Sequence, residues 1–441
     1  MTFKQFLAAG LGLTITATTA LAEPYCAPML DADALDRPYQ RLAPIYNSTE
    51  TGWIFGSDQL DYRYVLNATE QALLAELVAE LAERGTQLAV LIPPPRPVVA
   101  GQAVVDATTG QPGAYDMAAQ ATAFHEMMTQ IASTGATAPD LLTLALSDRS
   151  LTDSYYFQRD THWTNRGAAH SALALAGAVN AQDATFDPAE LVPVEMAEER
   201  GSLSRIVTAT CDTTPDAETS PLFDYSSHLP QSGGLLSETG ADGVQAVLLG
   251  TSFSDRYGRD QYQSADALTS ALGRPVENRS VSGGGIIGPF ENYLLSDDFA
   301  RDRPDLIIWE FPYTYQLRET GLRQLLGALR SERGVTSAGV FELTEDEAQI
   351  DMSSAHSRSS LLGLRMVEGS ARDIILRLHL EDGQDVRLRL RRKSRMEEVA
   401  ILDTWWIDLR GLGAPLASLG IEVRGDADLG KVELITDAVA G

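Results

Sequence analysis

Lysine is scarce in this 441-residue chain, which has only Lys4, Lys393 and Lys431. None of the three follows a glycine-rich loop that opens a helix, so a P-loop phosphate site and a buried Schiff-base lysine are both disfavoured. Basic residues as a whole number 34 against 61 acidic residues, which gives a formal net charge of -27. A charge of this sign and size excludes general binding to nucleic acid or to anionic lipid.

Cysteine is equally rare, since Cys26 and Cys211 are the only two. Their separation excludes a CxxC redox or metal motif. The sequence also has no HExxH motif, and the acidic stretch 31–36 lacks the glycine and the distal glutamate of a calcium loop. We therefore expect neither a metal nor a cofactor.

Long apolar runs are absent after the N-terminus, and the one at the N-terminus is short. Residues 1–22 combine the basic Lys4, an apolar run at 6–17 and the small-residue ending Ala20-Leu21-Ala22. This pattern is typical of a cleaved secretory signal peptide rather than of a membrane anchor. We expect a soluble periplasmic protein, and in that oxidising compartment Cys26 and Cys211 most simply form one disulfide that ties the mature N-terminus to the first domain.

Two kinds of periodicity divide the chain. Apolar residues recur at helical spacing over 69–84, and a short buried-strand pattern follows at 88–92. The pattern returns with strands at 244–249 and 306–309 and with helices near 117–132, 167–179 and 317–329. Alternating helices and strands predict an α/β fold with a mostly parallel sheet covered on both faces.

After about Gly334 the chain reads as strands without helices between them. The strands are expected at 374–380, 386–391, 400–408, 421–424 and 432–435. Their spacing fits a compact all-β sandwich. The predicted division is a signal peptide at 1–22, a catalytic domain at 23–335 and a β-sandwich module at 336–441.

The predicted strand at 244–249 ends at Gly250-Thr251-Ser252-Phe253-Ser254. This position is the carboxyl edge of a parallel sheet, where ligands bind in open α/β folds. Glycine permits a sharp turn there, and the backbone amides that follow can stabilise an oxyanion. Ser252 is therefore a candidate nucleophile, although a plain serine at a strand end has the same local sequence.

A serine nucleophile needs a base, and Arg159-Asp160-Thr161-His162-Trp163 supplies one. In an extended segment the side chains of Asp160 and His162 leave the same side of the backbone, so that the carboxylate can orient the imidazole. The other histidines fall in predicted helices, in a polar loop or in the β module, where a surface or packing role is the simpler interpretation. They are His125, His170, His228, His356 and His379.

These blocks carry a family resemblance. Gly250-Thr251-Ser252-Phe253 resembles the nucleophile block of SGNH hydrolases, with threonine where aspartate is usual. Asp160-Thr161-His162-Trp163 resembles the Asp-x-His-Trp block of the alginate O-acetyltransferases of the AlgX/AlgJ type, in which that block precedes the serine. The glycine run 282–285 and Trp309-Glu310-Phe311-Pro312 extend the resemblance. The Gly-x-Asn-Asp block, which supplies a side-chain oxyanion donor in ordinary SGNH esterases, is not apparent.

The resemblance implies an SGNH hydrolase-like parallel sheet flanked by helices, followed by a carbohydrate-binding module. It also implies that Cys26 and Cys211 form the disulfide of the first domain. The implied activity is transfer of acetyl through an acyl-serine to an exopolysaccharide, alginate or a similar polyuronate, with Ser252, His162 and Asp160 as the triad. The acetyl donor would be delivered by a membrane-bound partner, and proteins of an export complex are possible further partners.

Several residues are candidates for contacts with substrate. The candidates for the oxyanion are the backbone of Ser252 and the glycine run, represented by Gly284 and Gly285, although that run also fits an ordinary flexible turn. The candidates for the acceptor sugar are Arg256, Tyr257, Tyr313 and Tyr315, for each of which a structural role is an open alternative.

The β module offers a partner surface for an anionic polysaccharide. Arginines alternate with leucines in Arg387-Leu388-Arg389-Leu390-Arg391, which predicts a strand with Arg387, Arg389 and Arg391 facing outward. Guanidinium groups suit the carboxylates of a polyuronate, and an exposed Trp405 or Trp406 would stack on a sugar ring. A solvated charged face is the alternative interpretation.

Two other functions compete with acetyl transfer. A carbohydrate acetylesterase would use the same triad with water as the acceptor, and the sequence does not separate it from a transferase. A noncatalytic polysaccharide-binding scaffold of an export complex would carry a vestigial triad, but Ser252, His162 and Asp160 are all intact.

Overall fold

The structure is a computed structural model, which describes residues 24–61, 64–110, 115–179, 191–226, 246–256, 259–332, 334–344, 346–352, 356–367, 369–398, 403–424 and 430–437. The predicted signal peptide at 1–22 lies outside these residues. None of the helices within these residues has both the length and the apolar character that crossing a membrane requires.

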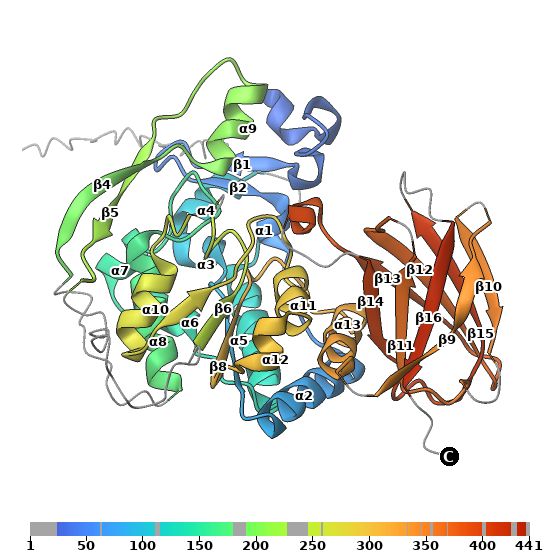
Figure 1. Cartoon of the computed structure of the whole chain (residues 1–441). Coiled ribbons are helices and arrows are strands. Elements are labelled where there is room, and N and C mark those ends of the chain that lie inside the picture. Colours follow the sequence, from blue (N-terminus) through green and yellow to red (C-terminus); the bar gives the residue numbers. More distant parts are fainter. Residues whose placement is uncertain are drawn as a thin grey trace, which may run out of the picture.

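A four-stranded parallel sheet with the order β3-β8-β6-β7 lies at the centre of the larger part of the chain (Figure 1). The strands are β3 (Gln87–Leu91), β8 (Leu306–Glu310), β6 (Ala246–Leu249) and β7 (Val276–Asn278). The runs in β6 and β8 are buried throughout, as expected for strands covered on both faces. The predicted α/β class with a parallel sheet is confirmed.

Helices cover this sheet, with α8 and α10 packed together on one side and α2, α11 and α13 on the other (Figure 1). The longer helices are α2 (Ala68–Glu83), α5 (Met117–Ser133), α8 (Asn165–Ala178), α10 (Ser264–Leu272) and α13 (Glu319–Arg330). The shorter helices are α1 (Ser57–Leu60), α3 (Arg96–Ala100), α4 (Gln102–Thr108), α6 (Leu141–Leu146), α7 (Arg149–Ser154), α11 (Gly288–Leu294) and α12 (Asp297–Arg301). Helix α2 begins where Asn67 and Glu70 form a reciprocal capping box.

A smaller layer lies above the carboxyl edge of the sheet. It contains β1 (Ile45–Asn47), β2 (Ile54–Gly56), α9 (Ser202–Thr210), the two-stranded ribbon β4 (Pro193–Glu199) and β5 (Glu218–Phe223), and the 3-10 turns η1 (Ala27–Leu30), η2 (Ala32–Ala34) and η3 (Gln40–Leu42). Some of its apolar residues, among them Met29, Ile45, Ile54 and Leu203, form a small cluster of their own, whereas Tyr46, Phe55 and Phe223 belong to the main core. The predicted disulfide between Cys26 and Cys211 is present and joins the N-terminal segment to the end of α9.

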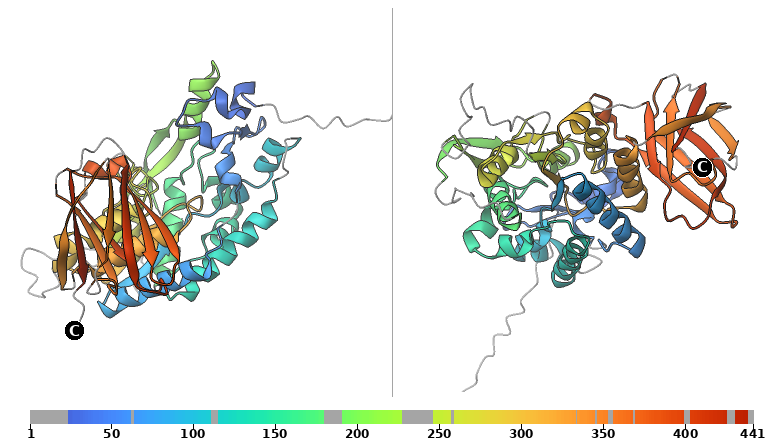
Figure 2. Two further views of the ribbon diagram at one scale, coloured as in Figure 1. Left: turned by 90° about the vertical axis from the view of Figure 1, so that its right-hand side faces the viewer. Right: turned by 60° about the horizontal axis from the view of Figure 1, so that its bottom comes forward.

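The C-terminal part is a sandwich of two four-stranded antiparallel sheets (Figure 2). One sheet has the order β10-β15-β12-β13 and the other β14-β11-β16-β9. The strands are β9 (Val335–Glu342), β10 (Glu347–Asp351), β11 (Leu361–Met366), β12 (Asp373–Leu380), β13 (Asp385–Arg391), β14 (Thr404–Asp408), β15 (Leu416–Arg424) and β16 (Lys431–Asp437). The sandwich is confirmed, and β9, β10 and β11 are strands beyond those expected.

Helix α13 and strand β14 form the junction between the two parts (Figure 1). At Gly327 a Cβ atom would lie 2.5 Å from the backbone nitrogen of Ile407, so the absence of a side chain there allows the backbones to touch. Arg330 of α13 bonds to Glu80 of α2 at 2.7 Å and also pairs with Asp408 of β14. The sandwich is thus held to the helical layer through buried contacts.

Candidate active site

Ser252 lies in the turn that follows β6, at the carboxyl edge of the parallel sheet. Glycine is required at position 250, because a Cβ atom there would collide with the carboxylate of Glu310 at the end of β8. Backbone amides of Ser254 and Asp255 both donate to the carbonyl of Thr251, at 3.1 and 3.0 Å, which closes the turn. The strand-to-turn geometry predicted for the serine is therefore present.

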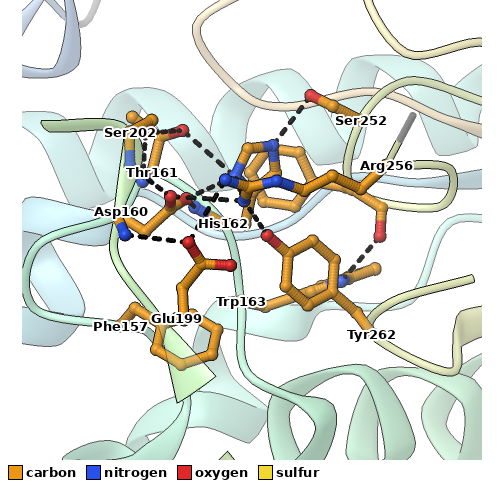
Figure 3. Close-up of polar contacts among 12 residues, drawn as sticks. Phe157, Asp160, Thr161, His162, Trp163, Glu199, Ser202, Ser252, Arg256 and Tyr262 are labelled. Atoms are coloured by element: carbon orange, nitrogen blue, oxygen red, sulfur yellow. Dashed lines mark hydrogen bonds and ion pairs between the residues drawn. The ribbon is translucent and has the colours of Figure 1, made fainter. Parts of the chain in front are cut away.

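The imidazole of His162 lies between Ser252 and Asp160 (Figure 3). Its Nε2 atom is 2.7 Å from Ser252 Oγ, and its Nδ1 atom is hydrogen-bonded to Asp160 Oδ1. The same carboxylate oxygen accepts the backbone amide of His162 at 2.8 Å. The structure thus brings together the three residues predicted as a triad, although 90 residues separate the histidine from the serine.

The carboxylate of Asp160 is completely buried. Burial alone would raise its pKa, but the electrostatic attraction and hydrogen bonds of His162, together with the positive charge of Arg256, outweigh that effect and hold the pKa well below its usual range. The backbone amide of Ser202, the first residue of α9, donates to Asp160 Oδ2 at 2.5 Å. Asp160 is therefore an ionised acceptor that can orient the imidazole through Nδ1.

The guanidinium of Arg256 occupies the far side of this carboxylate (Figure 3). One of its nitrogens is 3.3 Å from Asp160 Oδ2 and 3.3 Å from His162 Nδ1, and the other is 3.2 Å from Glu199 Oε1. Arg256 also donates to the hydroxyl of Tyr262, whose ring stacks on His162 with centroids 5.3 Å apart. Glu199, Tyr262 and Ser202 belong to the site but were not among the sequence candidates.

Arg256 was expected to contact the acceptor sugar, and the structure corrects that role. The side chain is buried behind the imidazole, and its guanidinium donates hydrogen bonds to Asp160, Glu199 and Tyr262. Its neighbour Tyr257, also a candidate for the acceptor, lies outside the described residues.

A cavity of about 360 Å³ opens onto Ser252 and His162. Its walls come from the N-terminal segment, from α9 and from the segment after β8. The lining includes Pro38, Tyr39, Arg41, Leu42, Asp58, Gln59, Thr161, Ser202, Leu203, Ile206, Phe253, Pro312, Tyr313, Thr314 and Tyr315. The cavity is large enough for an acetyl group together with part of a sugar.

Both tyrosines predicted to meet the acceptor line this cavity, in different ways. Tyr313 is buried, and its hydroxyl donates to the carbonyl of Gln59 at 3.3 Å. Tyr315 is 38% exposed, so its ring is available at the mouth of the cavity. The exposed ring of Tyr315 is the better placed of the two for contact with a sugar.

The glycine run was expected to bind the oxyanion, and its contacts point to a packing role instead. A Cβ atom at Gly284 would lie 2.8 Å from the sulfur of Met396, and one at Gly285 would lie 3.5 Å from the Lys393 side chain. Both neighbours belong to the connection between β13 and β14 in the sandwich. Gly284 therefore allows the sandwich to approach the sheet domain closely, whereas glycine at position 285 fits the positive φ of 76° there.

The arginine strand of the sandwich has the predicted alternation. In β13 the side chains of Arg387, Arg389 and Arg391 are exposed, whereas the leucines between them are buried. Asp373 on the neighbouring strand pairs with Arg389 at 2.5 Å and with Arg391 at 3.4 Å. Part of the positive charge on this face is thus neutralised within the sheet.

Trp405 is not available to stack on a sugar, which corrects the prediction. It is completely buried in the sandwich core, and the Arg392 guanidinium lies 3.9 Å from its ring centroid. Trp406 is also buried, because the opposite face of β14 packs on α13. Arg392, which follows the arginine strand directly, is buried as well and bonds to Glu291 of α11 at 2.6 and 2.8 Å.

The family model for the SGNH hydrolase-like domain of the acetyltransferase AlgX matches residues 48–313, which is more than half of the chain. The chain belongs to the AlgX family. The matched range of the family contains Asp160, His162 and Ser252.

Individual members of the AlgX family are moderately similar to the chain. The alginate biosynthesis protein AlgX of Pseudomonas putida is 29% identical over 336 residues, which cover 71% of this chain and 67% of the relative. AlgX of Azotobacter vinelandii is 27% identical over 312 residues, covering 69% and 62%. The matched segments thus span about two thirds of these AlgX relatives. A probable alginate O-acetylase AlgJ of Pseudomonas syringae is 27% identical over 303 residues, covering 62% and 71%.

A solved AlgX structure from Pseudomonas aeruginosa resembles the whole architecture. Its TM-score is 0.72 at 20% identity, with 94% of this chain and 99% of that chain covered. The likeness establishes that the sheet domain followed by the sandwich is the AlgX fold.

Proposed function

We propose that this protein is a polysaccharide O-acetyltransferase that works through an acetyl-serine at Ser252. The observation that carries the proposal is the 2.7 Å approach of His162 Nε2 to Ser252 Oγ, with the other ring nitrogen bonded to the buried Asp160. Membership of the AlgX family and similarity to a probable alginate O-acetylase support acetyl transfer as the reaction.

In the first half-reaction His162 takes the proton of Ser252 while Oγ attacks the carbonyl carbon of an acetyl donor. Asp160 keeps the imidazole in the tautomer with the proton on Nδ1 and stabilises the imidazolium that forms. The oxyanion is directed to the backbone amide of Ser252. Collapse of the intermediate breaks the bond between acetyl and donor, and His162 gives its proton to the leaving group.

In the second half-reaction a sugar hydroxyl takes the place of the departed donor. His162 removes the proton of the hydroxyl as its oxygen attacks the acetyl-serine, and Ser252 then recovers that proton as the acetyl group leaves. The cavity walls from the N-terminal segment and α9 support a sugar rather than bulk water as the acceptor, because they flank the serine and limit its exposure to solvent. Tyr315 is our candidate for a stacking contact with the acceptor.

We assign acceptor capture to the sandwich, taking residues 23–335 as the catalytic unit and 336–441 as the binding module. The exposed faces of Arg387, Arg389 and Arg391 suit the carboxylates of a polyuronate. Alginate is the polymer named for the relatives, so a polymer of its chemical class is the first substrate to test.

We place the reaction in the periplasm, with acetyl supplied by a membrane-bound partner of an export complex. The predicted signal peptide and the Cys26–Cys211 disulfide support an oxidising compartment. Because acetyl-CoA is a cytosolic donor, a partner in the membrane would have to present the acetyl group.

Product analysis tests the proposal against a carbohydrate acetylesterase. The full chain is incubated with a chromogenic acetyl ester, with and without oligouronates, and the products are identified by mass. We expect acetylated oligouronate from the wild type and none from Ser252→Ala. Acetate as the sole product would indicate an esterase, and no turnover at all would indicate a noncatalytic scaffold.

A further inference from the structure

A second buried carboxylate, which the proposed mechanism does not use, lies beneath the nucleophile turn. It belongs to Glu310, the last residue of β8, which neighbours β6 in the sheet. The residue is 0% exposed and does not line the cavity at Ser252. The carboxylate therefore contacts the turn from the protein interior and not from the cavity that opens onto Ser252.

The carboxylate of Glu310 accepts hydrogen bonds from both sides of Ser252. The backbone amide of Thr251 donates to Oε2 at 2.7 Å, and the Thr251 hydroxyl donates to Oε1 at 3.0 Å. The hydroxyl of Ser254 donates to Oε2 at 3.0 Å. The nucleophile thus lies between two residues, Thr251 and Ser254, that are anchored to the end of one strand.

The carboxylate of Glu310 is stabilised by these hydrogen-bond donors, and no basic side chain among the described residues forms an ion pair with it. Burial raises the pKa of Glu310 to about 7, and the hydrogen bonds from Thr251 and Ser254 oppose that rise. A buried carboxylate without a counter-ion is costly unless its hydrogen bonds are complete. The turn and the carboxylate therefore depend on each other.

The same contact accounts for two sequence features of the turn. Gly250 has no side chain because the carboxylate occupies the space of a Cβ atom. Threonine rather than aspartate stands at position 251 because a hydroxyl can donate to Glu310, whereas a second carboxylate there would repel it. Thr251, in the turn after β6, and Glu310, at the end of β8, form a matched donor–acceptor pair.

We propose that Glu310 is a positioning residue of this active site, which holds the 250–254 turn so that Ser252 Oγ points at His162 Nε2. The inference rests on the proposed nucleophile role of Ser252 but not on the identity of the acceptor. An esterase and a transferase would need it equally. Its loss misplaces the nucleophile without changing the cavity wall.

The test measures how fast Ser252 reacts with a serine-directed sulfonyl fluoride in the full chain, because this probe needs an activated serine but no acetyl donor or acceptor. Glu310→Gln replaces one acceptor oxygen by an amide donor, and we expect labelling to slow about 10- to 100-fold. With a chromogenic acetyl ester the same variant should lose kcat while KM changes little. Ser254→Ala, which removes one of the donors, should cause a smaller loss of the same kind.

A matched control separates positioning from loss of stability. Glu291→Gln removes another buried carboxylate, one that bonds to Arg392 at the junction and has no contact with the turn. This variant should lower the unfolding temperature but label at the wild-type rate. If Glu310→Gln does not fold, Ser254→Ala and Thr251→Val carry the test.

Exchange of the pair provides a rescue experiment. Thr251→Asp should be the slowest single variant, because it sets two carboxylates against each other. Adding Glu310→Gln to it should restore part of the labelling rate, since the new amide can donate to the new carboxylate.

Two results would overturn the positioning role and leave the proposed function standing. One is that Ser252 of Glu310→Gln is labelled at the wild-type rate. The other is that the double variant is labelled more slowly than Thr251→Asp alone. Absence of labelling in the wild type would instead overturn the proposed function, and the positioning role with it.

Discussion

Arg256 lies between two buried carboxylates, Asp160 and Glu199, and is the counter-ion of both. We expect Arg256→Met to lower the free energy of unfolding by about 3–5 kcal/mol, because it leaves two carboxylates buried without a cation. Labelling of Ser252 should slow as well, since Arg256 is one of the groups that lower the pKa of Asp160. Urea unfolding followed by circular dichroism measures the first effect.

The control for this prediction is Arg149→Met. Arg149 forms an exposed pair with Asp153, its side chain being 87% exposed, so its removal should cost less than about 1 kcal/mol. Equal stabilities of Arg256→Met and wild type would contradict the role of Arg256 as counter-ion.

The sequence predicted the triad residues because each has a local signature. Asp160 and His162 are two residues apart, and Ser252 follows a buried strand. The role of Arg256 has no such signature, because its carboxylate partners Asp160 and Glu199 lie 96 and 57 residues away in the sequence. The position of Glu310 at the end of the strand next to β6 could have marked it as a residue near the active site. The sequence does not show, however, which groups donate hydrogen bonds to a carboxylate at a strand end.

Helix α9 connects the disulfide to the triad. Its first amide donates to Asp160, its side chains Leu203 and Ile206 line the cavity, and its C-terminal cap, Cys211, is bonded to Cys26. Helix α9 packs on a small apolar cluster that includes Met29, Leu35 and Ile45. The disulfide adds a covalent link at the C-terminal end of α9, so this end of the cavity wall is fixed to the N-terminal segment.

We expect the double variant Cys26→Ser/Cys211→Ser to lose about 2–5 kcal/mol of stability. It should also divert acetyl from oligouronate to water, because a loosened wall admits solvent to the acetyl-serine. The ratio of acetate to acetylated sugar measures the diversion. An unchanged ratio in a variant of reduced stability would show that α9 keeps its place without the bond.

At the level of elements, apolar periodicity predicted three of the four strands of the central sheet and the helices α2, α5, α8 and α13. It missed the short fourth strand β7 and helix α10, and it missed the strands β1, β2, β4, β5, β9, β10 and β11. Strand β14 explains the error at the tryptophans: all five of its residues are buried, because one face meets the sandwich core and the other meets α13. The alternation of residues along a strand predicts which side chains share a face of the sheet. It does not show whether both faces of the sheet are covered by other elements.

The two parts of the molecule are joined by buried ions as well as by apolar contact. Arg392 of the sandwich bonds to Glu291 of the sheet domain, and both are almost completely buried.

The acidity of the whole chain lies mainly before residue 357, while the remainder is nearly neutral. A polyanion would therefore be held on the sandwich and not on the acidic domain.

We expect a single calorimetric unfolding transition for the wild type and two separate transitions for Arg392→Met. The substitution leaves Glu291 buried without its cation and loosens the junction, so the sandwich should unfold at a lower temperature than the sheet domain. Ser252 labelling at low temperature should stay close to wild type. One unshifted transition in the variant would contradict this account of the junction.

The central claim is that acetyl passes through Ser252, and peptide mapping after acid quenching tests it most directly. The full chain is mixed with an acetyl ester, quenched, digested and analysed by mass spectrometry, with and without a following addition of oligouronate. We predict one acetyl group on the peptide containing Ser252, its disappearance when oligouronate is added, matching formation of acetylated sugar, and no adduct in Ser252→Ala or His162→Ala. Acetylated sugar formed at the wild-type rate by Ser252→Ala, or an acetyl adduct on another residue that is passed to the sugar, would contradict the claim.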